Sequence, residues 1–480
     1  MDKLYFCGEF SDEVSQEEKR LLPHIKRFFE CVVGDTDFYE RVKASPHACT
    51  PLLESKGIIG VDPIQMLALV PEFPLMREIT IAEIQDKPQA LLWKRWRQAT
   101  HDYREVWRKK TEETPHQKFN AWHKRQVNRC SSQMGSATSA GIVHATIAFE
   151  LSKGCSMQCP FCGLASEALE KVFLYTDENA RLWQSVLEVV SDQLGTTAGT
   201  GVCYWGTEPT DNPDYFKFMS DFGQKTGIYP QTTTAAATRN LNWTNELLTF
   251  RREHPTAADR FSILSKAELD RVHALFSAED LSMTELILQY SESRKPFLAP
   301  SGRNRSRAES TAEVVKDHTI ACVTGYLVNM SDKTIKLVSP CPPSDEYPLG
   351  YYTFAEGEFS NAVELNDFME STMEQLMRLQ VKSDELLRFR QDLNFTALHD
   401  GFHLQTPYRS HKMVGAPHLV KLGQLIFEGN STASEVIDRL MIENLDVLAI
   451  ISSIQKLYDQ GLLEDPTLKR STLKSEVIGN

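Results

Sequence analysis

Three cysteines with unequal spacing are the residues best suited to do chemistry. Cys155, Cys159 and Cys162 form a C-x3-C-x2-C pattern within the segment Phe149 to Gly163. Three thiolates from one loop can bind three irons of a [4Fe–4S] cubane and leave the fourth iron open to a ligand. A structural zinc site is the alternative, but zinc usually takes four protein ligands, commonly in paired C-x2-C units, and the sequence has no second pair. The pattern therefore favours an iron–sulfur cluster.

The same segment resembles the cluster loop of the radical SAM superfamily. Phe161, directly before the last cysteine, matches the aromatic residue that this family places near adenine. The resemblance implies that the open iron binds the amine and carboxylate of S-adenosylmethionine (SAM). It also implies cleavage of SAM to methionine and a 5′-deoxyadenosyl radical, with the electron coming from a donor such as a flavodoxin or ferredoxin.

A second motif follows the next expected strand. The run Trp205-Gly206-Thr207-Glu208-Pro209 resembles the Gly-Gly-Glu-Pro loop that binds the amino group of SAM in that family, with Thr207 in place of the second glycine. The Glu208 carboxylate can accept a hydrogen bond from an ammonium group. A surface turn is the alternative interpretation, because the residues that follow are rich in Asp, Asn and Pro.

Hydroxyl side chains stand at the ends of two later expected strands. They lie in the segments 232–234 and 262–265, and the candidate cofactor contacts among them are Thr234 and Ser265. In the resembled family, residues at such positions contact the ribose or the methionine carboxylate of SAM. Packing inside the barrel is an equal alternative for both side chains.

The chain also resembles one group within that superfamily. The cluster loop, an N-terminal helical block and the late segment 339–344 resemble the peptide epimerases that mature ribosomal natural products of the proteusin type. The group removes a Cα hydrogen from an L-residue of a precursor peptide with a leader, and a thiol returns hydrogen to the opposite face, which gives the D-residue. The donor in that group lies in the segment that holds Cys341, which flanking prolines stiffen. Cys322 is the second candidate, and burial as a small apolar side chain is the alternative for both.

Two other functions compete with the epimerase. After Cys162 only Cys203, Cys322 and Cys341 remain, which disfavours the auxiliary clusters of many cross-linking enzymes. A different radical SAM modification of a peptide, without hydrogen return from a thiol, stays open. A non-catalytic, metal-stabilised winged-helix binding protein is the third hypothesis.

Strand and helix patterns alternate in the middle of the chain. Strands are expected at 144–151, 201–205, 232–236, 260–264 and 285–289, and helices near 177–194, 213–225, 240–254 and 266–276. This spacing is typical of βαβ units around a parallel sheet. The sequence therefore predicts an α/β fold, a partial (β/α)6, TIM-like radical SAM barrel with its chemistry at the carboxyl ends of the strands.

Helical and linker patterns come before this barrel. Residues 1–140 predict an N-terminal helical domain, and the Gly, Ser and Ala run at 133–141 predicts a linker. The barrel domain is expected at 141–345. It ends in a hairpin signal, because the β-prone runs 323–328 and 334–338 flank a short polar turn.

Two regions follow the predicted barrel. Residues 346–410 are expected to form a bridging region with one more antiparallel strand, at 350–354, and helices. Residues 411–480 predict a winged-helix-like domain, in which Ser431 or Thr432 caps a helix. Its surplus of acidic side chains speaks against DNA and favours recognition of a leader peptide by strand addition. A structural cap is the alternative, and the N-terminal helices can also bind a leader.

Composition narrows the class of protein further. Of the 480 residues, 41% are apolar and 24% charged, which is typical of a folded chain. The net charge of −13 argues against broad binding of nucleic acid. The sequence has no run of 18 apolar residues and its acidic start has no apolar signal core. We therefore expect a cytoplasmic enzyme whose partners are a precursor peptide and an electron donor, with no nucleic acid and no membrane.

Overall fold

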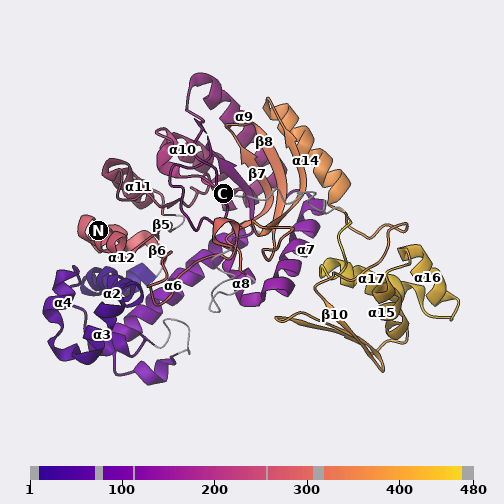
Figure 1. The fold of residues 1–480 in the computed structure, drawn as a ribbon, viewed down its shortest axis with the longest axis horizontal. Coiled ribbons are helices and arrows are strands. Elements are labelled where there is room, and N and C mark those ends of the chain that lie inside the picture. Colours follow the sequence, from indigo (N-terminus) through magenta and orange to yellow (C-terminus); the bar gives the residue numbers. More distant parts are fainter. Residues whose placement is uncertain (1–9, 71–78, 112–113, 256–257, 306–317, 467–480) are drawn as a thin grey trace, which may run out of the picture.

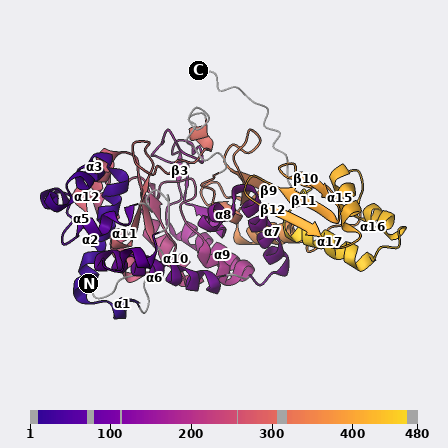
Figure 2. The ribbon, with the colours of Figure 1, turned by 90° about the horizontal axis from the view of Figure 1, so that it is seen from below.

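The computed structural model describes residues 10–70, 79–111, 114–255, 258–305 and 318–466, and its fold is mixed α/β (Figure 1). A helical N-terminal domain, a central α/β domain and a smaller C-terminal unit follow one another along the chain. Figure 2 shows them along the long axis of the molecule, with the central domain in the middle. None of the described helices is both long enough and apolar enough to cross a lipid bilayer.

Helices build the N-terminal domain, as the sequence predicts. They are α1 (Phe10–Glu13), α2 (Gln16–Gly34), α3 (Thr36–Ala44), α4 (Thr50–Ser55), α5 (Pro63–Leu67), α6 (Pro88–Lys110), α7 (Gln117–Met134) and α8 (Ser136–Gly141). Ser15 caps α2 in a capping box with Glu18, which pairs backbone donors that the helix cannot satisfy itself. The linker predicted at 133–141 is wrong for most of its length, because Gly135, with φ +88°, separates two helices rather than starting a loop.

Strands and helices alternate in the central domain. Its strands are β1 (Ala145–Glu150), β2 (Ser152–Lys153), β3 (Lys171–Val172), β4 (Thr233–Thr234), β5 (Asp259–Ile263), β6 (Thr284–Leu288), β7 (Val323–Asn329), β8 (Thr334–Pro340) and β9 (Tyr351–Glu358). Its helices are α9 (Asp177–Leu194), α10 (Tyr215–Thr226), α11 (Leu241–Glu253), α12 (Lys266–Leu275) and α14 (Ala362–Leu376). The predicted helices, the hairpin of β7 with β8 and the added strand β9 are confirmed.

Two sheets hold the parallel strands. β7 pairs with β1 in parallel, and β8 and β9 extend that sheet in antiparallel order. β4, β5 and β6 form a second, parallel sheet. Between the two sheets, the strand predicted at 201–205 is reduced to one bridge from Val202 to Ala148. Among the described strands β6 and β7 are not paired, so no barrel closes.

Strand β1 separates two apolar cores. Ile147 and Phe149 pack with α9 and α10 in the larger core. Ala145 and Ala148 face a smaller core on the other side, and a register shift between Ala145 and Ile147 changes the alternation. We call this second side, which also carries Val338, the inner face.

The C-terminal unit has its own sheet and core. β10 (Asn394–Leu398), β11 (Gly401–Gln405) and β12 (Ser410–Val414) form an antiparallel sheet before α15 (Leu419–Glu428), α16 (Ala433–Met441) and α17 (Val447–Asp459). Thr432 caps α16 in a capping box with Glu435, one of the two predicted caps. The apolar core of the unit runs from Leu387 to Leu463. The segment 387–410, which the sequence assigns to the bridging region, therefore packs with the C-terminal unit.

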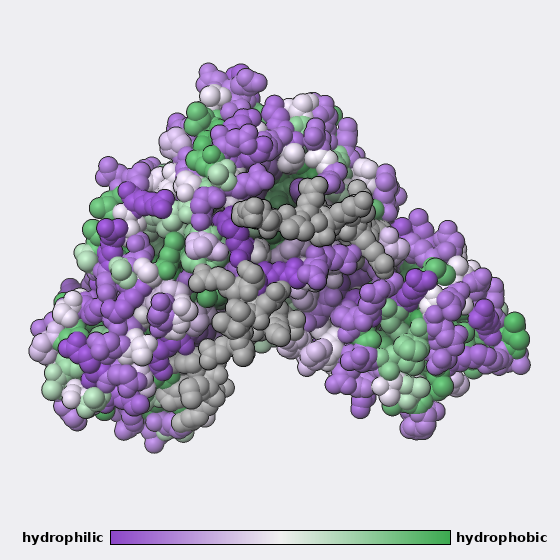
Figure 3. All heavy atoms as spheres, in the orientation of Figure 1, coloured by the Kyte–Doolittle hydropathy of each residue, from purple (hydrophilic) through white to green (hydrophobic). Residues whose placement is uncertain are grey.

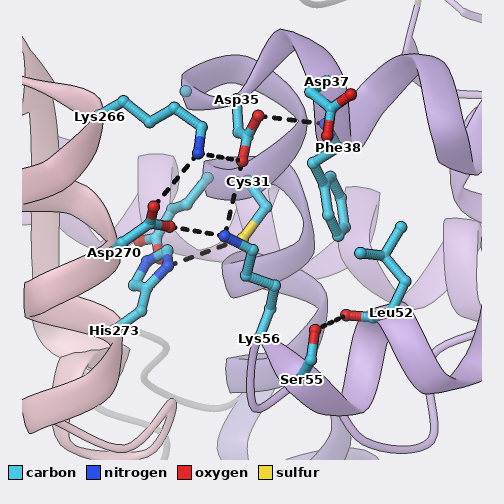
Figure 4. Close-up of polar contacts among 12 residues, drawn as sticks. Cys31, Asp35, Asp37, Phe38, Leu52, Ser55, Lys56, Lys266, Asp270 and His273 are labelled. Carbon is cyan, nitrogen blue, oxygen red and sulfur yellow. Dashed lines mark hydrogen bonds and ion pairs between the residues drawn. The ribbon is translucent and has the colours of Figure 1, made fainter.

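The N-terminal domain binds the central domain through α2 and α12. Arg27 Nη2 donates to the Phe276 carbonyl at 2.5 Å, so a guanidinium covers the carboxyl end of α12. Figure 4 shows the polar contacts beside it, where Lys56 lies 2.6 Å from Asp270 and Lys266 lies 3.1 Å from Asp35. In each of these ion pairs one residue belongs to the N-terminal domain and the other to α12, so the pairs fix α12 against the N-terminal helices.

A buried acid at this interface predicts a pH dependence. Burial works to raise the pKa of Glu30, but Lys26 and the His273 ring, 3.1 Å away, outweigh it and lower the pKa to about 2 from 4.5. A lowered acid pKa stabilises the fold above pH 4.5, and this contribution is lost as the pH falls from 4.5 towards 2. Glu30→Gln is expected to cost about 3 kcal/mol of unfolding free energy at pH 7. The difference from the natural protein should shrink at pH 3, as measured by urea denaturation.

Glu279→Gln is the matched control for that prediction. Glu279 pairs with His24 at the same interface, 3.1 Å apart, but is 29% exposed where Glu30 is 11% exposed. An exposed pair is worth about 1 kcal/mol or less. Equal costs for the two variants, or a Glu30→Gln cost that does not change with pH, would contradict the role given to Glu30.

Candidate functional site

The three predicted cluster cysteines lie on one loop at the carboxyl end of β1. Their side chains are neither fully buried nor fully exposed. The loop is fixed by its own backbone, because Cys155 N–H donates to the Glu167 carbonyl at 2.9 Å and Cys162 N–H donates to the Cys159 carbonyl at 3.1 Å. The Gln158 amide donates to the carbonyls of Cys155 and Glu167. These hydrogen bonds within the loop fix the positions of its three thiols relative to one another.

An arginine from a distant segment fastens the same loop. Arg303 Nε donates to the Cys159 carbonyl at 2.9 Å, and Arg303 N–H donates to the Cys162 carbonyl at 2.9 Å. Gly302 allows this approach, since a Cβ there would lie 2.4 Å from the Cys162 oxygen and its φ is +54°. Arg303 was not predicted, because a single arginine in a polar stretch gives no local signal of its partner.

The donor set fits an iron–sulfur cubane. Among the described residues no three His, Cys, Asp or Glu side chains converge on one metal ion. A cubane does not need such convergence, because each thiolate binds a separate iron at its own corner. Burial and the nearby Glu208 charge raise the pKa of Cys155 to about 11, so this thiol is protonated at neutral pH.

Glu208 and Thr234, predicted separately, meet beside the cysteine loop. Glu208 is buried, and its Oε1 accepts from Thr234 Oγ1 at 2.5 Å while its Oε2 accepts from Ala235 N–H at 2.9 Å. Its charge also acts on the thiols of Cys155 and Cys159, which places the carboxylate near both. Burial raises the pKa of Glu208, and the hydrogen bonds oppose that rise. A carboxylate held in this way can accept a cationic group.

The remaining residues of that motif shape its loop. Gly206 has φ +63°, a left-handed conformation that favours glycine, and a Cβ there would lie 2.7 Å from Glu150 Oε1. Thr207 N–H donates to the Tyr204 carbonyl at 3.2 Å, and Pro209 begins a short 3-10 helix. The segment therefore forms a turn and also carries Glu208, so the two interpretations of this motif are compatible.

The other two predicted cofactor contacts differ in their placement. Phe161, between the second and third cysteines in the sequence, is half-buried. Ser265 is exposed, and its hydroxyl accepts from Glu268 N–H at 3.1 Å, so it caps α12. No hydrogen bond between Ser265 and Glu208 is present among the described residues, and the contact of Ser265 with a cofactor stays a prediction.

The two candidate hydrogen donors lie on opposite sides of the sheet. Cys341 is 0% exposed, and it lies towards α7, near Arg129 and Cys130. Burial raises the pKa of the Cys341 thiol well above its usual range. Cys322 is half-buried on the inner face and belongs to the same apolar cluster as Leu164, two residues beyond the last cluster cysteine. Cys322 therefore shares an apolar cluster with a residue that follows the cysteine loop, whereas Cys341 lies towards α7.

Glu150 is a further residue on the inner face, and the sequence did not predict it as part of a site. Its Oε2 accepts from Asn329 Nδ2 at 2.8 Å, and its Oε1 lies against Gly206. Burial raises the pKa of Glu150 to about 7, although the Asn329 hydrogen bond opposes the rise. The residue ends β1 just before the cysteine loop, a position at which a carboxylate is a signal of a site.

Comparison with known proteins identifies relatives of unassigned function. The chain is 36% identical over 478 residues to "Uncharacterized protein y4wI" of Sinorhizobium fredii (strain NBRC 101917 / NGR234), covering 96% of this chain and 91% of the relative. The chain belongs to the y4wI family. Within it, residues 387–461 match the family described as "Protein y4wI C-terminal domain", nearly the span of the C-terminal core. No solved structure matches this chain.

Proposed function

We propose that this chain is a radical SAM enzyme that inverts Cα centres in a ribosomally made precursor peptide. The observation that carries the proposal is the loop of Cys155, Cys159 and Cys162 at the carboxyl end of a parallel strand, with the buried Glu208 beside it. When bound, a [4Fe–4S] cluster with SAM would supply a 5′-deoxyadenosyl radical. A flavodoxin or ferredoxin is the proposed electron donor, and the cytoplasm the proposed compartment.

The proposal gives each site residue a task. The three cysteines would hold the cluster, Glu208 would accept a hydrogen bond from the ammonium of SAM with Thr234 fixing its carboxylate, and Phe161 would contact the adenine. Six segments then form the partial barrel: β1, residues 201–205, β4, β5, β6 and β7. The parallel pairing of β1 with β7 and of β4 with β5 and β6 supports this arrangement.

Inversion needs a hydrogen donor on the opposite face of the peptide carbon. Cys322 precedes β7, and its carbonyl accepts from Ala145 N–H at the amino end of β1, whereas the cysteine loop follows the carboxyl end. In the proposed step the Cys322 S–H bond breaks as a new Cα–H bond forms, which leaves a thiyl radical. One electron from the electron donor and one proton restore the thiol.

A leader-binding role is proposed for the C-terminal unit. Among the described strands, β10 and β12 are the edges of its sheet, and an extended peptide can add to such an edge. Apolar surface is also gathered on this unit (Figure 3), where exposed side chains include Phe427, Ile442 and Leu448. A groove of about 870 Å³ runs between α7 and α17. These features favour a peptide over nucleic acid as the partner.

Cluster assembly tests the proposal directly. Protein reconstituted without oxygen is expected to bind iron and sulfide in [4Fe–4S] proportion, and reduced protein with SAM is expected to form 5′-deoxyadenosine. Alanine at Cys155, Cys159 or Cys162 should remove both signals, because two remaining thiolates cannot hold the cubane. Iron and sulfide assays, electron paramagnetic resonance and chromatography of the nucleoside provide the readouts.

Cys49→Ala is the control for cluster assembly. Cys49 is buried in the N-terminal domain, away from the loop, and its replacement should leave iron content and SAM cleavage unchanged. Protein that holds zinc and no sulfide would instead support the non-catalytic binding protein.

A further inference from the structure

A belt of polar side chains crosses the sheet of β4, β5 and β6 on the face opposite to its covering helices. Thr233, Arg260 and Glu285 are register neighbours on β4, β5 and β6, so their side chains point to the same face. The next residues of β5 in the alternation, Phe261 and Ile263, pack in the large core with the helices. Arg260 therefore points inward, where its charge acts on Cys322.

Hydrogen bonds extend the belt at both ends. Tyr204 Oη donates to the Gln231 amide oxygen at 2.5 Å, and the Gln231 amide donates to Thr233 Oγ1 at 2.9 Å. Arg260 Nε donates to Glu285 Oε2 at 3.0 Å. The interior of a TIM-type barrel is usually filled by Val, Ile and Leu. Ionised side chains in that place are costly unless they have a partner, and Arg260 and Glu285 are partners of each other.

The charges of the belt leave one cation unbalanced. Glu285 lies between two guanidinium groups, since Arg104 Nη2 also donates to its Oε1 at 2.6 Å. Two positive charges against one negative charge leave a net charge of +1. The Arg260 side chain is 39% exposed, and its two Nη groups have no hydrogen-bond partner among the described residues. A planar fork with free donors suits a pair of oxygens.

We infer that Arg260 binds a carboxylate of the substrate peptide and so holds the peptide beside Cys322. The carboxylate comes from an Asp or Glu side chain or from the C-terminus of the peptide. Arg260 is then the residue that selects acidic peptides. This inference rests on the proposed function for the statement that the substrate is a peptide, but it concerns binding and needs no radical chemistry.

Three short probe peptides test the inference in the anaerobically prepared protein. They are acetyl-Ala-Glu-Ala-amide, acetyl-Ala-Gln-Ala-amide and acetyl-Ala-Gln-Ala as the free acid, with dissociation constants from ligand-observed NMR. The Glu peptide or the free acid should bind about tenfold more tightly than the neutral peptide. The stronger of the two identifies the source of the carboxylate.

Two variants with opposite expected effects on the carboxylate preference distinguish a binding role of Arg260 from a loss of folding. Arg260→Gln should abolish the preference for the carboxylate, whereas Glu285→Gln should strengthen it because the competing carboxylate is gone. Arg252→Gln is the matched control, since Arg252 lies 2.9 Å from Asp280 and is also 39% exposed, but lies on α11. Equal binding of all three probes, or a preference that survives Arg260→Gln, would overturn the inference. Either outcome leaves SAM cleavage, and hence the proposed function, as a separate result.

Discussion

Cys322→Ala is expected to yield no D-residue while 5′-deoxyadenosine is still formed. Under the proposed function Cys322, which lies on the inner face, is the hydrogen donor, and cluster assembly and SAM cleavage would use other residues. In the assay a precursor peptide is treated with enzyme in D2O. The natural protein should leave one deuteron on each inverted Cα, because the exchangeable thiol proton is the one transferred. Mass spectrometry and chiral amino-acid analysis measure both label and inversion.

Cys341→Ala is the control that separates the two thiols. Cys341 is as completely buried as any core residue and packs towards α7. Its replacement is expected to cost stability through a small cavity and to leave the deuterium label intact. The opposite pattern, with label lost only in Cys341→Ala, would restore the preference drawn from the sequence. A natural protein that modifies the peptide without label would point to a different radical SAM reaction.

The second large effect is expected for stability. Asp259→Asn should lower the unfolding free energy by about 3–5 kcal/mol, because it leaves a buried guanidinium without its charge partner. The side chains of Arg251 and Asp259 are 2% and 0% exposed and lie 2.9 Å apart. Asp259 Oδ1 also accepts from Thr232 N–H at 2.9 Å, so the same carboxylate connects α11 with the start of β4. Urea denaturation followed by tryptophan fluorescence measures the shift.

Asp280→Asn supplies the exposed counterpart of this pair. Asp280 pairs with Arg252 at the same distance of 2.9 Å, but both side chains are more than a third exposed. Solvent screens such a pair, and its loss should cost about 1 kcal/mol or less. Similar losses of unfolding free energy for Asp259→Asn and Asp280→Asn would contradict the claim that burial makes the Arg251–Asp259 pair the more stabilising one.

Local patterns were enough to predict most elements of the central domain. The helix at 177–194 matches α9 because an apolar face repeats at helical spacing behind a Thr176 cap. The hairpin of β7 and β8 was predicted from two β-prone runs around a short turn. Which strands become neighbours was not predictable in this way, because the pairing of β7 with β1 depends on contacts far apart in the sequence.

Other elements had no local signal. The C-terminal sheet was missed because β10 is largely exposed and lacks a clear alternation of apolar residues. The direction of Cys341 follows the regular alternation of β8, in which Leu337 packs in the large core, Val338 lies on the inner face and Ser339 accepts a hydrogen bond from Arg129 of α7. Which face α7 covers depends on contacts far apart in the sequence, so the sequence alone could not place that thiol.

The docking of α2 on α12 also sets an order of events during synthesis. Arg27 and His273 are 246 residues apart, and the ribosome makes the N-terminal helices first. At roughly 5–20 residues per second, about 12 to 50 s pass before α12 has been made. During that time the face of α2 that carries Arg27 and Glu30 cannot yet pack against α12. A nascent protein arrested before residue 266 should therefore show this face to chaperones, and one arrested well after 300 should not.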